Sequence, residues 1–270
     1  MGEPLVAGVG FATVGKRSDL SGLDRALGRI EDAGATHAEL ALFEADLIAG
    51  GHVLPGPRRQ LEAICGRRRL RYTAHSTLSV NFMDEPNLEL HKAVCRANLE
   101  LAAAVGATVV VHHPGVIPVR PTHELDRLHA VERGALREIG DLAGRLGLRL
   151  AVETLFVESE AEYTADPVRL AAEIAAVAHP HVVGTLDVSH SYLMTRFRGM
   201  PFASAVAAFA PVTGHFHLHD SFGQPPGNLL GRPCCLAYPC FPGPCSRWSC
   251  PSATGANSTP AHRSHDASWS

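Results

Sequence analysis

The sequence predicts an α/β fold, a (β/α)8 TIM barrel of which seven of the eight strands can be identified. Short apolar segments alternate with longer amphipathic ones, and a strand–helix pair recurs about every 30 residues. The apolar segments are continuous rather than alternating with polar residues, which is typical of parallel strands covered by helices. The length of 270 residues is close to the usual size of such a barrel.

Seven strands are predicted from short apolar runs, most of which end in a polar residue. The runs are too short to be helices of ordinary length, and helical patterns separate each from the next. The predicted strands cover residues 6–11, 37–42, 71–75, 108–112, 148–152, 182–186 and 214–218.

Six helices are predicted between these strands. The clearest covers 89–105, where Leu90, Val94 and Leu101 recur at helical spacing and Gly106 follows at the position of a C-cap. The others are predicted by the same spacing, with glycine or proline at several of their ends. The predicted helices cover residues 20–33, 56–69, 89–105, 124–146, 167–178 and 202–209.

A doubly wound parallel sheet is the alternative fold. It would normally carry a G-x-G-x-x-G turn after the first strand, where a dinucleotide binds. The sequence offers only Gly8-Val9-Gly10 there, which is too weak a signal. We therefore predict the barrel.

Composition excludes several other classes of protein. The chain is 46% hydrophobic and 19% charged, and no apolar run reaches the roughly 18 residues of a membrane span. The N-terminal residues do not resemble a signal peptide, so a cytoplasmic location is expected. The net charge of −3 gives no electrostatic footprint for nucleic acid or for an anionic membrane.

The character of the sequence changes at residue 225. Residues 1–224 are predicted to form an incomplete barrel domain, whereas 225–270 hold five of the seven cysteines with eight prolines and seven serines. This tail has no apolar periodicity, and we expect it to be disordered. A disulfide or metal module and a native Pro/Ser tail are alternatives. We favour an out-of-frame translation product, because the change is abrupt and interrupts a motif.

Carboxylates and imidazoles stand at the ends of six predicted strands. The residues are Glu39, His75, His113, Glu153, Asp187 and His217, with His190 three residues after Asp187. Chemistry in a barrel sits at the carboxyl ends of the strands. Buried charge is costly unless it is paired or bound to metal, so a metal site is favoured. The residue types suit Mn²⁺, Zn²⁺, Co²⁺ or Mg²⁺.

Four segments at the ends of predicted strands form recognisable motifs. They are His113-Pro114-Gly115, Ala151-Val152-Glu153-Thr154, Gly184-Thr185-Leu186-Asp187-Val188-Ser189-His190 and His215-Phe216-His217-Leu218-His219-Asp220. These segments resemble motifs of the xylose-isomerase-like barrels, a superfamily that joins sugar isomerases and epimerases to apurinic-site endonucleases of the endonuclease IV type. The resemblance spans roughly residues 5–224 and implies a TIM barrel with a divalent metal at its mouth.

The resemblance assigns roles in the epimerase branch. Glu153, Asp187 and His217 resemble three of its four metal ligands, and His190 resembles its substrate-binding histidine. The fourth ligand is a Glu on strand eight, and this chain has no Glu after Glu173. The predicted function is therefore a metal-dependent sugar or sugar phosphate isomerase/epimerase that acts through an enediolate, with Glu153 as catalytic base. The missing Glu makes inactivity of this chain an alternative.

The endonuclease branch is the competing interpretation. His75, His113, Glu153, Asp187, His190 and His217 resemble six of the nine ligands that hold its three zinc ions. Residues 1–224 carry five more acidic than basic residues and few aromatic ones, so they offer neither a basic surface nor stacking residues to bind DNA. We therefore favour a carbohydrate substrate. A degenerate, non-catalytic barrel is a third alternative. The sequence leaves open which sugar is bound and whether the chain forms a homo-oligomer.

Several candidates also have plain structural interpretations. His112 and His113 are neighbours on a strand and must point to opposite faces; the motif selects His113 as the inward metal ligand. His75 and Glu39 are predicted to contact substrate, although Glu39 could instead support a ligand or cap the chain. His219 shares a face with His217 and is either a polar loop residue or a support for the site.

Overall fold

The computed structural model describes residues 6–13 and 19–219 and shows one parallel sheet of seven strands. The strand order is β1-β2-β5-β6-β8-β10-β11, so each major strand lies beside the next in the chain. The prediction of seven strands in this order is confirmed. Their bounds are Gly10–Ala12, His37–Ala41, Arg71–His75, Ala107–His112, Arg149–Glu153, Val182–Asp187 and Thr213–His217.

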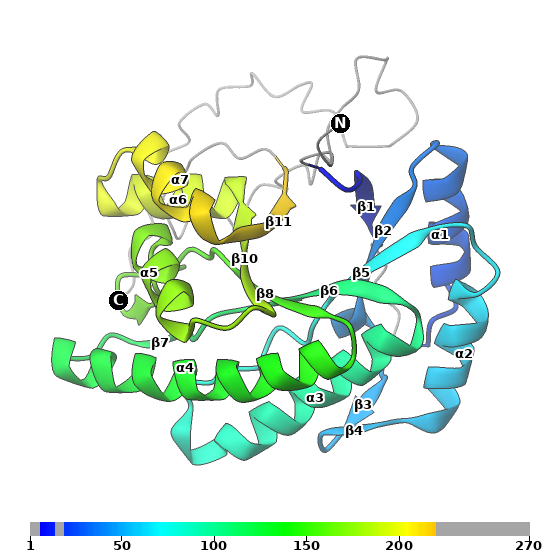
Figure 1. The fold of residues 1–270 in the computed structure, drawn as a ribbon, viewed down its shortest axis with the longest axis horizontal. Helices are drawn as coiled ribbons and strands as arrows, with labels where there is room; N and C mark the ends of the chain where they lie inside the picture. Colours follow the sequence, from blue (N-terminus) through cyan, green and yellow to red (C-terminus); the bar gives the residue numbers. More distant parts are fainter. Residues whose placement is uncertain (1–5, 14–18, 220–270) are drawn as a thin grey trace, which may run out of the picture. The chain divides into compact units, whose positions relative to one another are not determined.

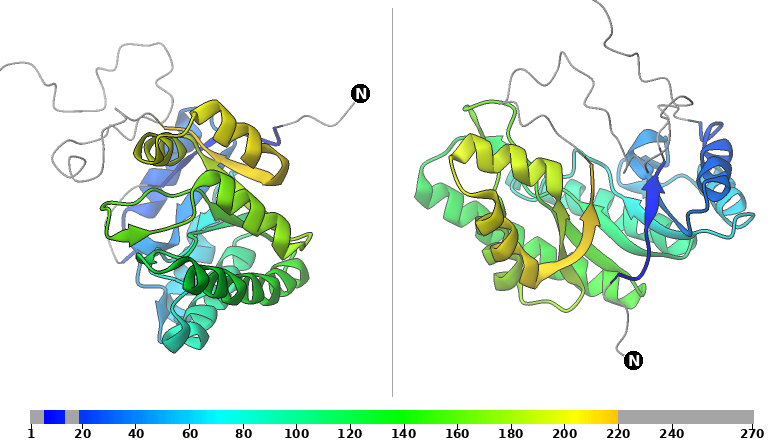
Figure 2. Two further views of the ribbon diagram at one scale, coloured as in Figure 1. Left: turned by 90° about the vertical axis from the view of Figure 1, so that its left-hand side faces the viewer. Right: turned by 90° about the horizontal axis from the view of Figure 1, so that it is seen from above.

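The sheet is curled into an open barrel (Figure 1). Glu39 on β2 lies within 3.2 Å of His215 and His217 on β11, although four strands separate β2 from β11 in the sheet. Such contacts require the inner faces of the two strands to turn toward each other. Within the described residues, β1 and β11 form the two ends of the sheet (Figure 2). The predicted loss of the eighth strand and the predicted tail fall on 220–270, outside the described residues.

Seven α-helices connect the described strands, and α1 to α5 run along the outside of the sheet (Figure 1). Asp166 begins α5 by accepting hydrogen bonds from the backbone N–H groups of Val168 and Arg169. Gly106, at φ +71°, and Gly147, at φ +73°, follow α3 and α4, where glycine tolerates the left-handed conformation. The helices are α1 Leu23–Asp32, α2 Pro55–Cys65, α3 Leu88–Ala104, α4 Thr122–Arg145, α5 Pro167–Val177, α6 Val188–Arg198 and α7 Phe202–Phe209.

Helix α6 was not predicted, because its buried side is largely polar. Ser189, Ser191 and Thr195 are buried, so the sequence lacks the apolar period of an ordinary surface helix. The sequence also gave no sign of the short elements in the loops. They are the strand pairs β3 Ile48–Ala49 with β4 His52–Val53 and β7 Ile117–Pro118 with β9 Glu162–Tyr163, and the 3₁₀ turns Leu42–Glu44, Glu85–Asn87 and Ala210–Val212.

The core lies between the sheet and its helices, and it contains both cysteines of the barrel. Cys65 and Cys95 are free and buried, as expected of small apolar residues on helices. Burial raises the pKa of Cys65 to about 11 and that of Cys95 to about 12, so neither thiol is ionised at neutral pH. No helix among the described residues combines the length and apolar character needed to cross a membrane.

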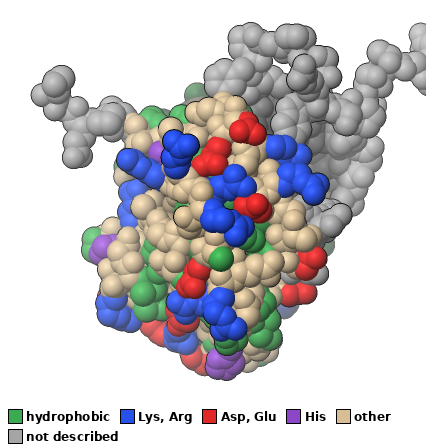
Figure 3. All heavy atoms as spheres, turned by 90° about the vertical axis from the view of Figure 1, so that its right-hand side faces the viewer, with side chains coloured by type: hydrophobic (Ala, Val, Ile, Leu, Met, Phe, Trp, Pro, Cys, Tyr) green, Lys and Arg blue, Asp and Glu red, His purple; other side chains and the backbone are tan. Residues whose placement is uncertain are grey.

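Basic side chains on the α1–α2 side of the molecule have acidic neighbours. Figure 3 shows Lys and Arg side chains interspersed with Asp and Glu over this face. Arg68 contacts Asp24 at 2.7 Å and Glu31 at 3.3 Å, which joins the end of α2 to α1. The charge of the segment Arg67-Arg68-Arg69, which precedes β5, is therefore partly balanced by Asp24 and Glu31.

Candidate metal centre

The structure brings together the acidic and histidine side chains predicted at the strand ends. Glu153 and Asp187 are the last residues of β8 and β10, and each is only 1% exposed. Because the strands are parallel, their carboxyl ends meet at one end of the barrel. His75 and His217 are the last residues of β5 and β11 and reach the same place. Glu39 also reaches it, but from the middle of β2 and not from the predicted strand end. His113 follows β6 directly, and His190 lies in the first turn of α6.

Glu153 lies at the centre of this group and contacts four imidazoles. Its Oε1 is 2.7 Å from His217 Nδ1 and 3.5 Å from His190 Nδ1. Its Oε2 is 3.2 Å from Nε2 of both His75 and His113. Burial by itself would raise the pKa of Glu153, but the hydrogen bonds from these histidines outweigh it and hold the pKa well below its ordinary value. Glu153 is therefore a carboxylate at neutral pH.

The two carboxylate oxygens of Asp187 have different partners. Oδ1 accepts a hydrogen bond of 2.7 Å from the backbone N–H of His190 and so caps α6. Oδ2 faces the site, 2.7 Å from His219 Nε2 and 3.6 Å from His217 Nδ1. Burial tends to raise the pKa of Asp187, and hydrogen bonds from His217 and His219 lower it on balance. Thr154 fixes the strand end by accepting from the Asp187 N–H at 3.0 Å.

The histidines of the group respond to these carboxylates. Burial would lower the pKa of His75, His190 and His217, but the neighbouring carboxylates outweigh it and raise all three pKa values. For His113, burial prevails and the pKa is lowered. A metal ion binds only neutral imidazole, so metal and protons compete for the raised histidines.

The side chains fit a divalent metal ion. Carboxylate and imidazole are the donors that Zn²⁺, Mn²⁺ and related ions accept. Within residues 6–13 and 19–219, no Lys or Arg forms an ion pair with Glu39, Glu153 or Asp187, so three buried carboxylates rely on histidines for compensation. Among the residues that the structure describes, four sets of three place ligand atoms within 4.8 Å of one another: Glu153–Asp187–His217, His75–His113–Glu153, Asp187–His190–His219 and Glu39–His215–His217.

Sequence reasoning understated the contribution of β11. His215 and His219 both touch carboxylates of the group, His215 Nε2 at 3.0 Å from Glu39 and His219 Nε2 at 2.7 Å from Asp187. The signal was present in the alternation of 215, 217 and 219, which places all three on one face. Only His217 was selected as a ligand, because the motif pointed to it.

His112 lies on the opposite face of β6 from the candidate metal centre, as predicted. Its ring is fully buried, with its centroid 4.7 Å from that of Phe82. Neither ring nitrogen has a hydrogen-bond partner among the described residues. Burial lowers the pKa of His112 to about 3, which keeps the ring neutral.

The comparison with known families agrees with this architecture. A sequence model described as xylose isomerase-like TIM barrel matches residues 27–239. The chain belongs to this family. A search of curated protein sequences gives no significant match. The resemblance drawn from the four sequence motifs is thereby confirmed at the level of the family.

Solved structures with the same fold include sugar epimerases. A D-tagatose 3-epimerase-like protein has a TM-score of 0.62 and 18% identity, over 80% of this chain and 78% of its own. The D-allulose 3-epimerase from Methylomonas sp., solved with D-allulose, has a TM-score of 0.61 and 15% identity, over 79% and 73%. A xylose isomerase-like TIM barrel protein from Mycobacterium smegmatis, solved with magnesium, has a TM-score of 0.59 and 17% identity, over 79% of this chain and 74% of its own. At these identities the likeness concerns the fold.

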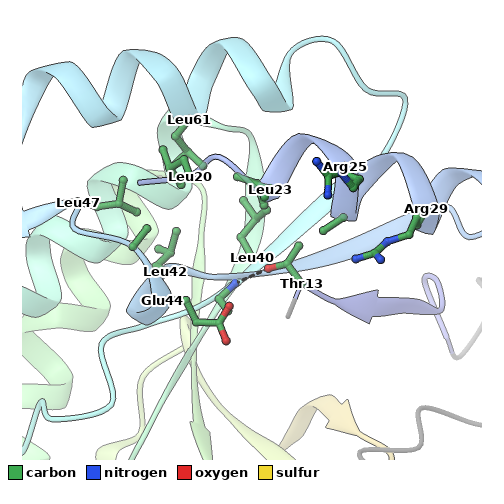
Figure 4. A pocket seen from close by; sticks show the side chains of 14 residues that line it. Thr13, Leu20, Leu23, Arg25, Arg29, Leu40, Leu42, Glu44, Leu47 and Leu61 are labelled. Atoms are coloured by element: carbon green, nitrogen blue, oxygen red, sulfur yellow. Dashed lines mark hydrogen bonds between the residues drawn. The ribbon is translucent and has the colours of Figure 1, made fainter. Parts of the chain in front are cut away.

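A cavity of about 260 Å³ between β2 and α1 is separate from the metal centre (Figure 4). Six of the fourteen residues that line it are leucines, and Arg25 and Arg29 of α1 lie along one side. Leu40 lines this cavity, whereas its neighbour Glu39 points to the opposite face of β2, into the barrel. None of the predicted site residues lines the cavity.

Proposed function

We propose that this barrel is a divalent-metal-dependent sugar isomerase or epimerase that moves a proton on a carbon next to a carbonyl. The observation that carries the proposal is the group Glu153–Asp187–His217, which gathers two buried carboxylates and an imidazole at the barrel mouth. Structural likeness to a D-tagatose 3-epimerase-like protein and to a D-allulose 3-epimerase supports this choice of substrate class.

Glu153, Asp187 and His217 would hold the ion. A divalent ion bound there would polarise the carbonyl and hydroxyl oxygens of a sugar. Glu153 is ionised, and its carboxylate is the group that we propose accepts a proton from a substrate carbon. The metal would be one of Mn²⁺, Zn²⁺, Co²⁺ and Mg²⁺, all of which accept this donor set.

We propose that His190 contacts the substrate. Its Nδ1 lies 3.1 Å from the carbonyl oxygen of Thr154 and 3.5 Å from both Glu153 and Asp187. A proton on Nδ1 satisfies the Thr154 carbonyl and leaves Nε2, on the other side of the ring, as the atom that meets a sugar hydroxyl. His75 contacts Glu153 from the other side of the group, and we propose that it borders the same substrate.

A second proton-transfer group is required, because an epimerase must return the proton that it removes. The family's strand-eight Glu has no counterpart after Glu173 in this sequence. We therefore expect proton abstraction by Glu153 to be retained better than complete turnover. The proposed substrate is a small carbohydrate, and the two buried free thiols are consistent with a cytoplasmic location.

The group His75–His113–Glu153 favours a second candidate function. It shares Glu153 with the first group, and a carboxylate shared by two ions is typical of centres that hydrolyse phosphate esters. The second candidate is therefore a zinc-dependent hydrolase that resembles the apurinic-site endonucleases. His113 would be a metal ligand in the hydrolase, whereas in the isomerase or epimerase it would lie beside the metal.

Metal analysis and two activity assays test the proposal on the full chain. We expect one equivalent of Mn²⁺ or Co²⁺ per chain, together with exchange of a substrate C–H for deuterium when a panel of ketoses is incubated in D₂O. Two or three equivalents of zinc with incision of abasic DNA would instead establish the hydrolase. A well-folded chain that binds no metal would overturn both proposals.

A further inference from the structure

The two ring nitrogens of His217 face carboxylates on opposite sides of the barrel. Nδ1 lies 2.7 Å from Glu153 Oε1 and 3.6 Å from Asp187 Oδ2, in the proposed metal centre. Nε2 lies 3.0 Å from Glu39 Oε1 and 3.2 Å from Glu39 Oε2. Glu39 comes from β2, near the opposite end of the curled sheet from β11.

A neutral imidazole carries a proton on one nitrogen only, and only the other nitrogen can bind a metal ion. We propose that Glu39 is a positioning residue for His217: its carboxylate accepts the Nε2–H and thereby leaves Nδ1 free to bind the metal. The inference rests on the metal centre of the proposed function. A carboxylate behind a ligating histidine fixes the ring orientation and makes the imidazole a stronger donor.

Glu39 is itself held firmly enough for this role. It is 9% exposed, and the hydroxyl of Thr73 donates to Oε2 at 3.2 Å from the facing position on β5. His215 Nε2 lies 3.0 Å from the same oxygen. Thr73 and His215 therefore hold the Glu39 carboxylate in place independently of His217. The carboxylate can then determine the orientation of the His217 ring.

Glu39, His215 and His217 could alternatively hold a metal ion of their own. His217 would then have to give Nε2 to that ion and Nδ1 to the ion at Glu153 and Asp187, which requires loss of both ring protons. Neutral histidine cannot satisfy both centres at once. The 3.0 Å separation of Nε2 from Glu39 is an ordinary hydrogen-bond distance and needs no such deprotonation.

Titration with Co²⁺ tests the proposal, with wild type compared to Glu39→Gln and Glu100→Gln in the full chain. Glu100 is exposed on α3 and provides the same change of charge away from the site. We expect Glu39→Gln to bind Co²⁺ about 10–100-fold more weakly at unchanged stoichiometry. Glu100→Gln should bind like wild type.

Two further variants keep the test decisive. Thr73→Val removes only the hydroxyl that donates to Glu39, and we expect Co²⁺ binding about threefold weaker even if Glu39→Gln does not fold. His215→Gln should preserve the stoichiometry. Loss of one equivalent of Co²⁺ in both Glu39→Gln and His215→Gln would show that Glu39 is a ligand. Unchanged affinity in Glu39→Gln would overturn the positioning role alone, whereas a wild-type chain that binds no Co²⁺ overturns the metal centre and this role with it.

Discussion

Two buried clusters in this barrel contain histidines and carboxylates, and they differ in what balances the negative charge. The mouth cluster consists of Glu39, Glu153, Asp187 and the histidines around them. The α4–α5 cluster consists of His129, Glu132, Arg133, Arg169 and Glu173, with His129, Glu132 and Glu173 at most 6% exposed. Both hold acidic groups away from water, so burial does not distinguish them.

The two clusters differ in whether arginine balances the buried carboxylates. In the α4–α5 cluster, Glu173 pairs with both Arg133 and Arg169, the latter at 2.6 Å. Glu132 accepts a hydrogen bond of 2.7 Å from the Gly115 backbone N–H. A guanidinium is permanently charged and cannot yield its place to a metal ion, whereas a histidine can lose its proton and become a ligand. We therefore interpret the α4–α5 cluster as structural, and the mouth cluster remains the proposed site.

Glu153→Gln gives the largest expected effect, because four histidines depend on this one carboxylate. We expect exchange of the substrate proton to fall on the order of 10³-fold and metal binding to be lost. Isotope exchange in D₂O and Co²⁺ titration measure the two effects. Retention of both near wild-type levels would show that the mouth cluster is as structural as its counterpart.

Glu173→Gln makes the equivalent change in the α4–α5 cluster. It leaves Arg133 and Arg169 without their shared anion, and we expect the free energy of unfolding to fall by about 3 kcal/mol. Urea denaturation of the metal-free chain measures this loss. Co²⁺ binding by the folded variant should be unchanged, and a weakened affinity would contradict the division into a site and a structural cluster.

His112 sharpens the comparison, since it is buried with neither a carboxylate nor an arginine. Its pKa of about 3 in the folded chain lies below the ordinary value near 6.5, so between these values the unfolded chain binds more protons and stability falls as the pH falls. From pH 7 to pH 5, we expect the metal-free wild type to lose about 2 kcal/mol more than His112→Leu. Urea denaturation at both pH values tests this; parallel losses would count against it.

The sequence predicted the strand ends well because a buried parallel strand is apolar until it leaves the core. Glu153 and Asp187 stood out as the first charged residues after such runs, and both lie at the mouth. Contacts across the barrel were not predictable in this way. Nothing local to Glu39 indicates that His217, far along the chain, will meet it, since that contact depends on how strongly the sheet curls.

The errors at other elements have similar causes. The first strand was predicted over 6–11 but occupies Gly10–Ala12, because an apolar run shows where a strand is favourable and not where its partner begins to pair. Helix α6 was missed because its buried residues include Ser189 and Ser191. Where a helix buries polar residues, the regular spacing of apolar residues that would reveal it in the sequence is absent.

The cap that Asp187 provides to α6 ties the proposed metal centre to the start of a helix. Oδ1 accepts the His190 backbone N–H, and Oδ2 faces the histidines, so Oδ2 is the oxygen that would be offered to a metal ion. The same hydrogen bond holds the backbone of His190. The first turn of α6 therefore sets the positions of a carboxylate and an imidazole of the proposed site together.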